Sequence, residues 1–572
     1  MISMMRRFLP LLGLAGLLAA TAAAQPVVTG ALNTASYALS GLPNGGLAQG
    51  SMIAIFGRNI GPASIAQAQS FPLPKTLGGT SARLSAGGAN YDLILTYTLA
   101  SQVGAIIPSN TPIGTAQLTV TYNGQTSANF AVNIVRSSFG IFTSNQAGSG
   151  PAIAQNFNTQ TDQPINSILS AARPGQTITL WGTGLGPISG DDAAGAAPGD
   201  LGIAVEVLVG NRPATIRYRG RSGCCAAVDQ IVFDVPAGIE GCYTPLTVRV
   251  GNIISNSTYL AISPNGGRCT AGTPFTDADL QKLQSGGTLS IGSVSLNRIA
   301  SKLNLGPLGT QDIKIDAGAG AFIRYNAAQI AASQFAAEGA LPYGSCVTFA
   351  SGDQATGLPE DPIVGTVLDA GPKLNVTGPS GTREMLRDAA SGFYSATFST
   401  GTPSIPGLPS IPGLPGGGAG PFLDAGGFTI DNGSGAVVGG FRTQLNIAGN
   451  FAWSNEAAVN TLVRSSGQEF TWSGAGTDST VVIFGFSFDG VANVGGGFYC
   501  LERGSANRFN VPASILLSMP RNVAPPGQGG DLIPTAQVGV GLTSNPVRFN
   551  ASNLDIGVAT HSVLSFKGVN VQ

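Results

Sequence analysis

A single histidine limits the chemistry that this sequence could perform. His561 lies in Thr560-His-Ser-Val-Leu-Ser-Phe566, a segment that alternates like a strand. A Ser-His-acid hydrolase would have to use this histidine, yet the sequence has no Gly-x-Ser-x-Gly elbow. One histidine is also too few for a typical zinc site once the cysteines are assigned to disulfides. No phosphate-loop or dinucleotide-binding motif appears in a strand-to-helix context, so we predict no catalytic residue, no metal ligand and no cofactor, and we expect His561 to be structural.

Paired carboxylates are the route to catalysis that the sequence leaves open. Cleavage of a glycosidic bond needs two of them, held about 5–10 Å apart. The C-terminal region offers Glu338, Asp353, Glu360, Asp361, Asp369, Glu456, Glu469 and Asp478. Their spacing singles out no pair, so we interpret them as solvated loop charges or turn caps and keep a carbohydrate-active enzyme as an alternative. Asp191-Asp192 with Asp200 could hold calcium, but the calcium-loop pattern is absent and loop solvation is favoured.

The tryptophans give a mild signal for binding. Trp181 occupies the position that Phe56 holds in an internal repeat, which predicts a core residue. Trp453 and Trp472 are the possible ligand-contact aromatics. An exposed indole could stack on a sugar ring or fill a pocket of a partner. The opposing interpretation buries the ring inside an alternating strand, and it is favoured for Trp472, whereas the two interpretations are balanced for Trp453.

Residues 1–24 have the pattern of a secretory signal peptide. Arg6-Arg7 precede an apolar stretch from Phe8 to Ala20, and Ala22-Ala23-Ala24 offers a small-residue cleavage site. The apolar run is short for a membrane span and no second one follows. We therefore expect a secreted protein of the extracellular space or the cell surface, with the periplasm as an alternative, and no integral membrane segment after cleavage.

The six cysteines, Cys224, Cys225, Cys242, Cys269, Cys346 and Cys500, all follow that segment. An even number of cysteines in an exported chain predicts disulfides. We predict one bond between Cys346 and Cys500. We further predict that Cys224 and Cys225 bond to Cys242 and Cys269, because adjacent cysteines on a strand point to opposite faces. A Cys224–Cys225 ring is the alternative.

Composition indicates a β-rich chain with few charges. The 572 residues include 82 glycines and 36 prolines, and 10% are charged, which suits short strands and turns rather than long exposed helices. The formal net charge is −1 and no basic run occurs, so nucleic acid is excluded as an expected partner. Polysaccharide or another surface protein fits this composition as a partner, and a neutral soluble β protein without such a partner is the alternative.

An internal repeat organises the first half of the chain. Gly50-Ser-Met-Ile-Ala-Ile-Phe-Gly-Arg-Asn-Ile-Gly-Pro62 returns as Gly175-Gln-Thr-Ile-Thr-Leu-Trp-Gly-Thr-Gly-Leu-Gly-Pro187. A recurrence of apolar alternation followed by a Gly-Pro stop predicts two copies of one β-module. We place the modules at residues 25–136 and 137–270.

The remaining residues, 271–572, form a β-rich region in which the repeat is lost. A capped helix is predicted at Thr276–Leu283 and a second helix at Asn326–Glu338. Residues 401–420 repeat Ser-Ile-Pro-Gly-Leu-Pro and then become glycine-rich, which predicts an exposed insertion.

The modules resemble the immunoglobulin-like IPT/TIG class, especially the tandem form common in secreted bacterial proteins of unknown function. The residues that carry the resemblance are Ala31–Ser36, Gly50–Pro62, Gly140–Phe142, Gly175–Pro187, Cys224–Ile231, Val235-Pro236, Gly241-Cys242 and Leu246–Val248. It covers about residues 27–270 and implies a β-sandwich fold but no activity and no functional residues. Residues 271–572 resemble, more vaguely, the accessory β-domains found beside such modules.

We therefore predict a mostly-β protein with two tandem immunoglobulin-like sandwiches and a larger C-terminal β-sandwich region that has one or two short helices. The predicted role is non-enzymatic: extracellular binding, adhesion or surface structure. The alternatives are a carbohydrate-active enzyme whose carboxylates lie in the C-terminal region and a self-associating envelope or matrix protein.

Overall fold

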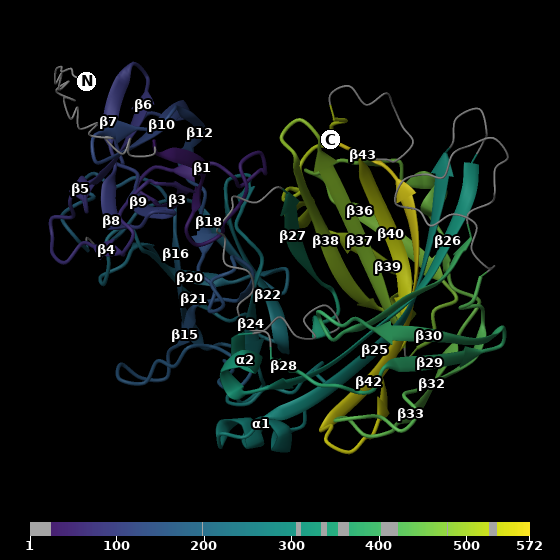
Figure 1. Cartoon of the computed structure of the whole chain (residues 1–572). Coiled ribbons are helices and arrows are strands. Elements are labelled where there is room, and N and C mark those ends of the chain that lie inside the picture. The colour runs from purple at the N-terminus through teal and green to yellow at the C-terminus, as the bar shows by residue number, and fades with distance from the viewer. Residues whose placement is uncertain are drawn as a thin grey trace, which may run out of the picture.

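The computed structural model describes residues 25–196, 198–304, 310–332, 340–352, 365–401, 421–477, 479–525 and 535–572. The expected signal peptide (1–24) and residues 402–420 of the expected insertion lie outside the described residues. Strands are the main regular structure of the described chain, as predicted, and only a few short helices accompany them (Figure 1). No helix among these residues is long and apolar enough to cross a membrane.

The first module is a sandwich of two sheets. One sheet has the order β1 (Val27–Asn33), β3 (Met52–Arg58), β9 (Gln102–Ile106), β8 (Ile94–Thr98) and β4 (Ala66–Gln67). The other has the order β2 (Leu47–Ala48), β12 (Phe130–Val135), β10 (Gly114–Tyr122), β6 (Thr80–Ala86) and β5 (Thr76–Leu77), with β7 (Ala89–Asp92) and β11 (Gln125–Thr126) at its side. Alternating residues such as Ile53, Ile55, Leu84 and Leu118 fill the space between the sheets.

The second module repeats this arrangement. Its first sheet has the order β13 (Gly140–Ile141), β16 (Thr177–Thr183), β21 (Asp229–Asp234), β20 (Thr215–Arg221) and β17 (Gly199–Asp200), with β15 (Ala154–Asn156) beside β16. Its second sheet has the order β14 (Gly150–Pro151), β24 (Thr258–Ile262), β22 (Gly241–Val250), β18 (Val205–Val209) and β19 (Arg212–Pro213), with β23 (Ile253–Ile254) beside β22. The repeated sequence forms β3 in one module and β16 in the other, and each pairs with the corresponding later strand, β9 or β21.

A buried ion pair lies where the two modules meet. Arg221 at the end of β20 pairs with Asp229 at the start of β21, and both side chains are almost fully buried. Arg221 Nη2 also donates to the backbone oxygens of Gly50 in the first module (2.8 Å) and Gly186 in the second (2.9 Å). Burial raises the pKa of the Asp229 carboxyl, whereas Arg221 and the N–H of Leu185 oppose the rise. One guanidinium thus links the backbones of both modules.

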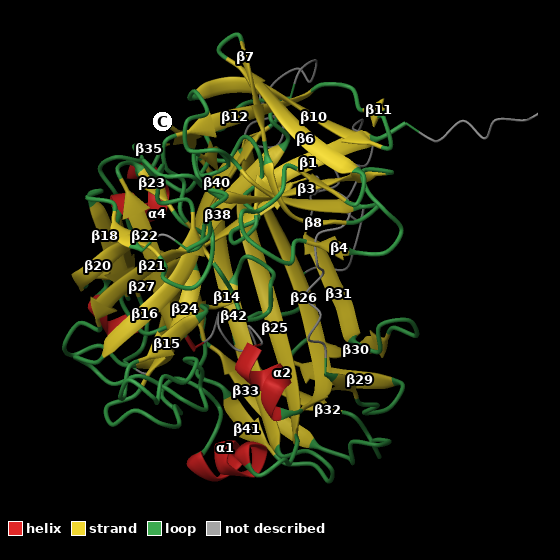
Figure 2. Cartoon of the chain, turned by 90° about the vertical axis from the view of Figure 1, so that its left-hand side faces the viewer, coloured by secondary structure: helices red, strands yellow, loops and turns green. Residues whose placement is uncertain are grey.

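The C-terminal region is built on one long sheet. Its order is β27 (Ser345–Gly352), β38 (Val494–Arg503), β37 (Thr480–Asp489), β40 (Ala536–Thr543), β42 (Ile556–Gly568), β25 (Leu289–Asn304), β26 (Thr310–Tyr325), β31 (Tyr394–Gly401), β30 (Gly381–Arg387), β29 (Lys373–Gly378), β32 (Gly426–Asp431) and β33 (Arg442–Ile447). Two short strands, β28 (Thr366–Val367) and β41 (Val547–Phe549), pair with β26 and β42. Figure 2 shows β42, β25, β26 and β31 side by side in this sheet.

Smaller elements complete the C-terminal region. They are the sheet of β34 (Ala452–Trp453), β36 (Gln468–Ser473) and β39 (Arg508–Val511), the pair β35 (Thr461–Leu462) and β43 (Asn570–Val571), helices α1 (Asp277–Gln284), α2 (Ala327–Ala332) and α4 (Ala513–Leu516), and the 3-10 turns η2 (Glu456–Ala458) and η3 (Gly504–Ala506). The capped helix predicted from Thr276 is confirmed as α1, with reciprocal hydrogen bonds between Thr276 and Asp279. The second predicted helix is observed as α2, and residues 333–338 of that prediction lie outside the described residues.

A buried carboxylate lies beside one of the apolar cores that pack against the long sheet. Asp316 of β26 accepts from Arg298 Nε (2.6 Å) and Nη2 (2.8 Å) and from Ser399 Oγ (3.0 Å). It also accepts from the N–H groups of Phe422 (2.6 Å) and Leu423 (2.9 Å), where the described chain resumes after residue 401. Burial alone would raise the pKa of this carboxyl, but the Arg298 guanidinium and the two N–H groups outweigh burial and lower it.

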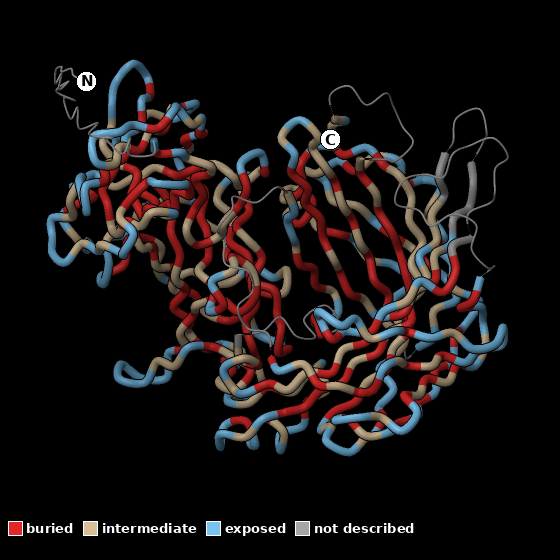
Figure 3. Tube along the Cα trace, viewed as in Figure 1, coloured by how far each residue is buried: buried red, intermediate tan, exposed pale blue. Residues whose placement is uncertain are grey.

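Buried contacts join the C-terminal region to both modules. Tyr243 and Tyr259 of the second module pack with Phe275, Leu280 and Val482 of the C-terminal region in one apolar cluster. A second cluster joins the first module to the start of β38, through Leu39, Phe56 and Val494 among others. Figure 3 shows that buried residues run along the chain both in the modules and in the C-terminal region. The three parts of the molecule therefore bury apolar surface against one another.

Candidate functional site

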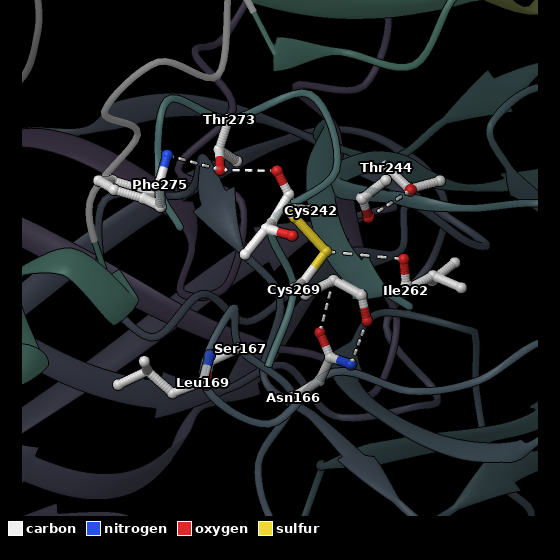
Figure 4. The surroundings of a disulfide bond; sticks show 12 residues. Asn166, Ser167, Leu169, Cys242, Thr244, Ile262, Cys269, Thr273 and Phe275 are labelled. Carbon is white, nitrogen blue, oxygen red and sulfur yellow. Dashed lines mark hydrogen bonds between the residues drawn. A yellow bond between two sulfur atoms is a disulfide. The ribbon is translucent and has the colours of Figure 1, made fainter. Parts of the chain in front are cut away.

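The structure bonds the six cysteines in three pairs. The predicted Cys346–Cys500 bond is confirmed, and it joins two residues that lie directly opposite each other on β27 and β38. Cys242 bonds to Cys269, which ties the second module to the segment that leaves it (Figure 4). Cys224 bonds to Cys225, so the predicted bonds from these two residues to Cys242 and Cys269 are wrong and the alternative ring is correct. The prediction failed because Cys224 and Cys225 lie in a turn, where the alternation of a strand does not apply.

The Cys224–Cys225 ring lies beside the joint between the two modules. Both cysteines are exposed, and the turn that holds them connects β20 to β21. The next residues, Ala226 and Ala227, pack on Ile94 of the first module in a small apolar cluster. This position suits a structural role at the joint.

The two tryptophans that were candidates for ligand contact are buried. Trp453 is 6% exposed and its indole N–H donates to Asn455 Oδ1 at 2.8 Å. Trp472 is 3% exposed and donates to the backbone oxygen of Gly504, also at 2.8 Å. Both rings belong to the core that surrounds the Cys346–Cys500 bond. Neither ring has a face free to stack on a ligand. For Trp472 this is the interpretation that the sequence favoured, and for Trp453, where the two interpretations were balanced, the buried one holds.

Trp181, which was predicted to be a core residue, is more exposed than expected. The repeat correctly equates it with Phe56, since both lie at the same position of β3 and β16. Phe56 is buried because Leu39 and Val494 cover that face of the first module. Trp181 is half-buried, and its indole N–H donates to Gln155 Oε1 at 2.9 Å. The prediction of a core residue fails because the cover comes from parts of the chain outside the repeat.

The carboxylates that could serve an enzyme are spread over different elements. Glu456 lies in η2 and Glu469 in β36, while Asp369 lies 3.7 Å from the Arg387 guanidinium. Glu338, Asp353, Glu360, Asp361 and Asp478 lie outside the described residues. Within the described ranges, no group of three or more His, Cys, Asp or Glu side chains could hold a metal ion.

The aspartates considered for calcium also have other roles. Asp192 is buried at the joint between the modules, where it accepts from the N–H and the hydroxyl of Ser109 at 2.7 and 2.8 Å. Asp191 caps the turn at Ala193, and Asp200 caps the turn at Gly202. Asp191 and Asp200 therefore cap loops, whereas Asp192 forms hydrogen bonds between the two modules.

A row of aromatic rings on the long sheet is the strongest candidate for a binding site. Phe349 of β27, Phe484 and Phe486 of β37 and Phe566 of β42 form it, and we call these four residues the phenylalanine platform. The Phe349 ring centroid lies 5.6 Å from that of Phe484 and 6.4 Å from that of Phe486, with planes at 26° and 9°. Phe566 meets Phe484 edge-on at 5.6 Å. Phe349 is 39% exposed and the other three are half-buried.

Glycines on the intervening strands let the rings lie down across the sheet. Phe349 is directly opposite Gly497 of β38, and a Cβ added to Gly497 would be 2.5 Å from Phe349 Cζ. Phe566 is directly opposite Gly539 of β40, and a Cβ there would be 2.6 Å from the Phe566 ring. Since each ring occupies the space above a glycine, it covers backbone instead of projecting into solvent. The result is a low aromatic surface supported by a rigid sheet.

The platform lies between the contacts that attach the two modules. Val347 of β27 is buried in the cluster with the second module. At the other end of β27, Gly352 is packed so closely that a Cβ added there would be 2.8 Å from Leu39 Cδ1 of the first module. Around the rings, Ser351 is exposed and Gln537 is half-buried. Both can donate to or accept from a hydroxyl group.

Sequence reasoning did not find the platform because its members come from three distant segments. A usable signal exists in the sequence, where Phe484-Gly-Phe486 alternates on one strand while Gly495-Gly-Gly497 and Gly539-Val-Gly541 leave space on its neighbours. Only the strand order shows that these segments are adjacent.

Comparisons with known proteins assign no family. No protein-family model matches the chain, and no curated protein matches it. Among solved structures, a surface glycan-binding protein, SGBP-B, from a xyloglucan utilization locus of Bacteroides uniformis is 10% identical with a TM-score of 0.15, covering 65% of this chain and 85% of that one. Domains 5–6 of the S-layer protein SbsC are 12% identical with a TM-score of 0.14, covering 41% and 98%. A gamma-CGTase from alkalophilic Bacillus clarkii is 11% identical with a TM-score of 0.15, and the match covers 49% of this chain but only 34% of that enzyme. At such TM-scores these likenesses carry no inference about what the present chain binds.

Proposed function

We propose that this protein is a secreted, non-enzymatic polysaccharide-binding protein whose contact site is the phenylalanine platform. The observation that carries the proposal is the set of half-buried, closely spaced rings on one face of a rigid sheet. Aromatic side chains offer apolar contact area with little conformational freedom to lose, and their faces suit flat, ring-shaped groups. A sugar ring has an apolar face of this kind and hydroxyl groups at its edge.

The surroundings of the rings support a neutral polar ligand. Ser351 and Gln537 provide hydrogen-bonding groups next to the aromatic surface, as a hydroxylated ligand requires. Within the chain as a whole, only 10% of residues are charged and the formal net charge is −1. Recognition by charge is therefore not the basis of the proposal.

Three disulfides support the proposed location outside the cytoplasm, since such bonds persist in oxidising compartments. The tandem modules, by packing against the C-terminal region at both ends of β27, would position the platform. The IPT/TIG identity of the modules remains part of this proposal.

The test asks whether the protein is retained by polysaccharides without releasing an enzymatic product from them. Affinity electrophoresis in gels that contain neutral polysaccharides is expected to retard the wild type, with no new reducing ends released. The double variant F349A/F484A is expected to weaken retardation at least about tenfold, which corresponds to about 1.4 kcal/mol. Phe393→Ala is the matched control, because Phe393 is 38% exposed but lies away from the platform between β30 and β31.

A second variant protects the test against misfolding. S351E places a charge at an exposed position beside the rings and removes no packed group. Circular dichroism and thermal melting should show that S351E and F393A fold like the wild type. Retardation of S351E and of F349A/F484A equal to that of F393A would overturn the platform as the site. Release of reducing ends that survives in both platform variants would favour the enzyme instead.

A further inference from the structure

The face that carries the platform continues into a strip of small polar side chains. Its members, which we call the polar strip, are Ser295 and Asn297 of β25, Thr560 and Ser562 of β42, and Ser395 and Thr397 of β31. Ser562 Oγ donates to Asn297 Oδ1 at 2.7 Å, and Asn297 Nδ2 donates to Ser295 Oγ at 3.0 Å. Ser395 and Thr397 are exposed and the other four are half-buried. The strip is therefore an ordered surface that solvent reaches.

Strand register places the strip on the same side as the platform. Phe566 pairs with Ser301, and residues 301, 299, 297 and 295 of β25 alternate onto one face. From Asn297 the register continues across Ala317 of β26 to Thr397 of β31. Ile299, which is exposed, lies between the aromatic and polar parts. The two surfaces are thus continuous.

Most charged side chains of these strands lie on the opposite side of the sheet. Arg298 and Asp316 lie next to members of the face along β25 and β26, but they pair with each other on the opposite side of the sheet. Lys567 follows Phe566 and likewise points to the opposite side, where its ammonium donates to Glu456 O. Along the described strands from β27 to β31, the charged side chain found on this face is Arg503, at the end of β38, where it packs over a tyrosine ring. Apart from Arg503, the described part of this face is uncharged, because strand alternation places the other charged side chains on the opposite side of the sheet.

The face is also wide. The order β27-β38-β37-β40-β42-β25-β26-β31 contains eight strands and seven spaces. At about 4.8 Å per space, the path across the face, followed along the twisted sheet, is about 34 Å. A single glycan chain crossing the platform would use only part of this width. A neutral, wide face that combines apolar rings with hydroxyl groups matches a ligand that is itself wide, neutral and hydroxylated.

We propose that the ligand is an insoluble neutral polysaccharide whose chains lie side by side in a flat surface, and that the polar strip contacts chains next to those held by the platform. This inference rests on the proposed polysaccharide-binding function. A binding site for one soluble chain would not need the strip. A surface of parallel chains presents sugar-ring faces to the platform and hydroxyl groups to the strip at the same time.

The test compares insoluble polymers with their soluble fragments. Depletion from solution is measured on microcrystalline cellulose and on chitin particles, and binding of the matching hexasaccharides is measured by calorimetry. The variant T397E adds a charged, longer side chain at an exposed position of the strip, far from the platform in sequence. T115E, at an exposed position of β10 in the first module, is the matched control.

The expected result is adsorption to at least one insoluble polymer, a loss of at least fivefold in T397E, no loss in T115E, and unchanged hexasaccharide binding in both variants. Full adsorption of T397E to the polymer would overturn the inference about the polar strip. The proposed function would still stand or fall on the separate result with F349A/F484A. Failure to bind any polymer or hexasaccharide would overturn both. Light scattering that shows a dimer dissociated by T397E would also overturn the inference, because a second copy would then cover the face.

Discussion

The single histidine permits an isolated test of a buried, unsatisfied group. His561 lies on β42 and is 4% exposed. Neither ring nitrogen has a hydrogen-bond partner among the described residues, although the backbone N–H donates to Ser544 Oγ. Burial disfavours the charged imidazolium and lowers the pKa of His561 below its ordinary value. We therefore expect His561 to be neutral in the folded protein at pH values where an exposed histidine is already protonated.

The sign of the pH effect follows from proton binding. With a lowered pKa, the folded state binds fewer protons than the unfolded state once the pH falls below about 6.5. The free energy of unfolding should therefore fall from that pH downward until the folded-state pKa is reached. One proton gives at most about 1.4 kcal/mol per pH unit, so acidification from pH 6.5 to 5.0 can cost up to about 2 kcal/mol.

The perturbation is H561L, with H561Q as its companion. Both remove the titrating ring, so both should flatten the pH dependence between pH 6.5 and 5.0. Leucine also removes two buried polar atoms that lack partners. The free energy of unfolding of H561L at pH 7.5 should therefore exceed that of the wild type by on the order of 1 kcal/mol. The conservative H561Q keeps a polar group and should not gain that stability.

The assay is chemical unfolding followed by tryptophan fluorescence in a W181F background. Trp453 and Trp472 both lie in the C-terminal core, so this background reports the part of the chain that contains His561. Parallel pH dependence in wild type and H561L would refute the reasoning. A proton-resolved titration of the imidazole with an ordinary midpoint would refute it independently.

Three further changes test a buried ion pair in the C-terminal region and the joint between the two modules. D316N should lower the free energy of unfolding by about 3 kcal/mol, because it removes a buried, hydrogen-bonded carboxylate and leaves the Arg298 guanidinium with the exposed Asp424 as its charge partner. Since the pKa of Asp316 is lowered, its stabilisation is present above the ordinary carboxyl pKa and is lost as the pH falls through the folded value; acid unfolding of wild type and D316N should therefore converge below about pH 4. D229N should lower the free energy of unfolding of the second module by about 3–5 kcal/mol, measured by Trp181 fluorescence. A decrease of less than about 1 kcal/mol would contradict a stabilising ion pair at the joint. C224S/C225S should speed hydrogen exchange at Ala227, which packs on the first module, and leave exchange in β37 unchanged; equal exchange at both places would show that the ring does not hold the joint.

The fold followed from the sequence where the pattern was local or repeated. Duplication of the Gly50–Pro62 motif predicted two sandwiches, and the alternation within it correctly located β3 and β16. The capping pattern at Thr276 located α1 because a cap needs only residues within one turn. Cys346 and Cys500 could be paired because the other four cysteines cluster elsewhere in the sequence.

The candidate site could not be predicted in the same way because it depends on strand order. Phe349, Phe484 and Phe566 become neighbours only when β27, β38, β37, β40 and β42 are placed in sequence across one sheet. The sequence offered Trp453 and Trp472 as possible ligand contacts, yet both rings are packed inside the C-terminal core. Burial of Phe56 but not of Trp181 shows the same limit, since part of the cover of Phe56 comes from Val494 of β38, more than 400 residues away.

The attachment of the modules argues against a role as flexible spacers. Independent spacers would be joined by polar linkers with few contacts, whereas here the second module shares a buried cluster with Val482 and Val347 of the long sheet. The first module packs on the other end of β27 and on Val494. Movement of either module would expose this apolar surface to water, at about 25 cal/mol for each Å². The platform between these contacts is therefore held in a fixed relation to both modules, and a surface fixed in this way suits a ligand that is itself extended and rigid.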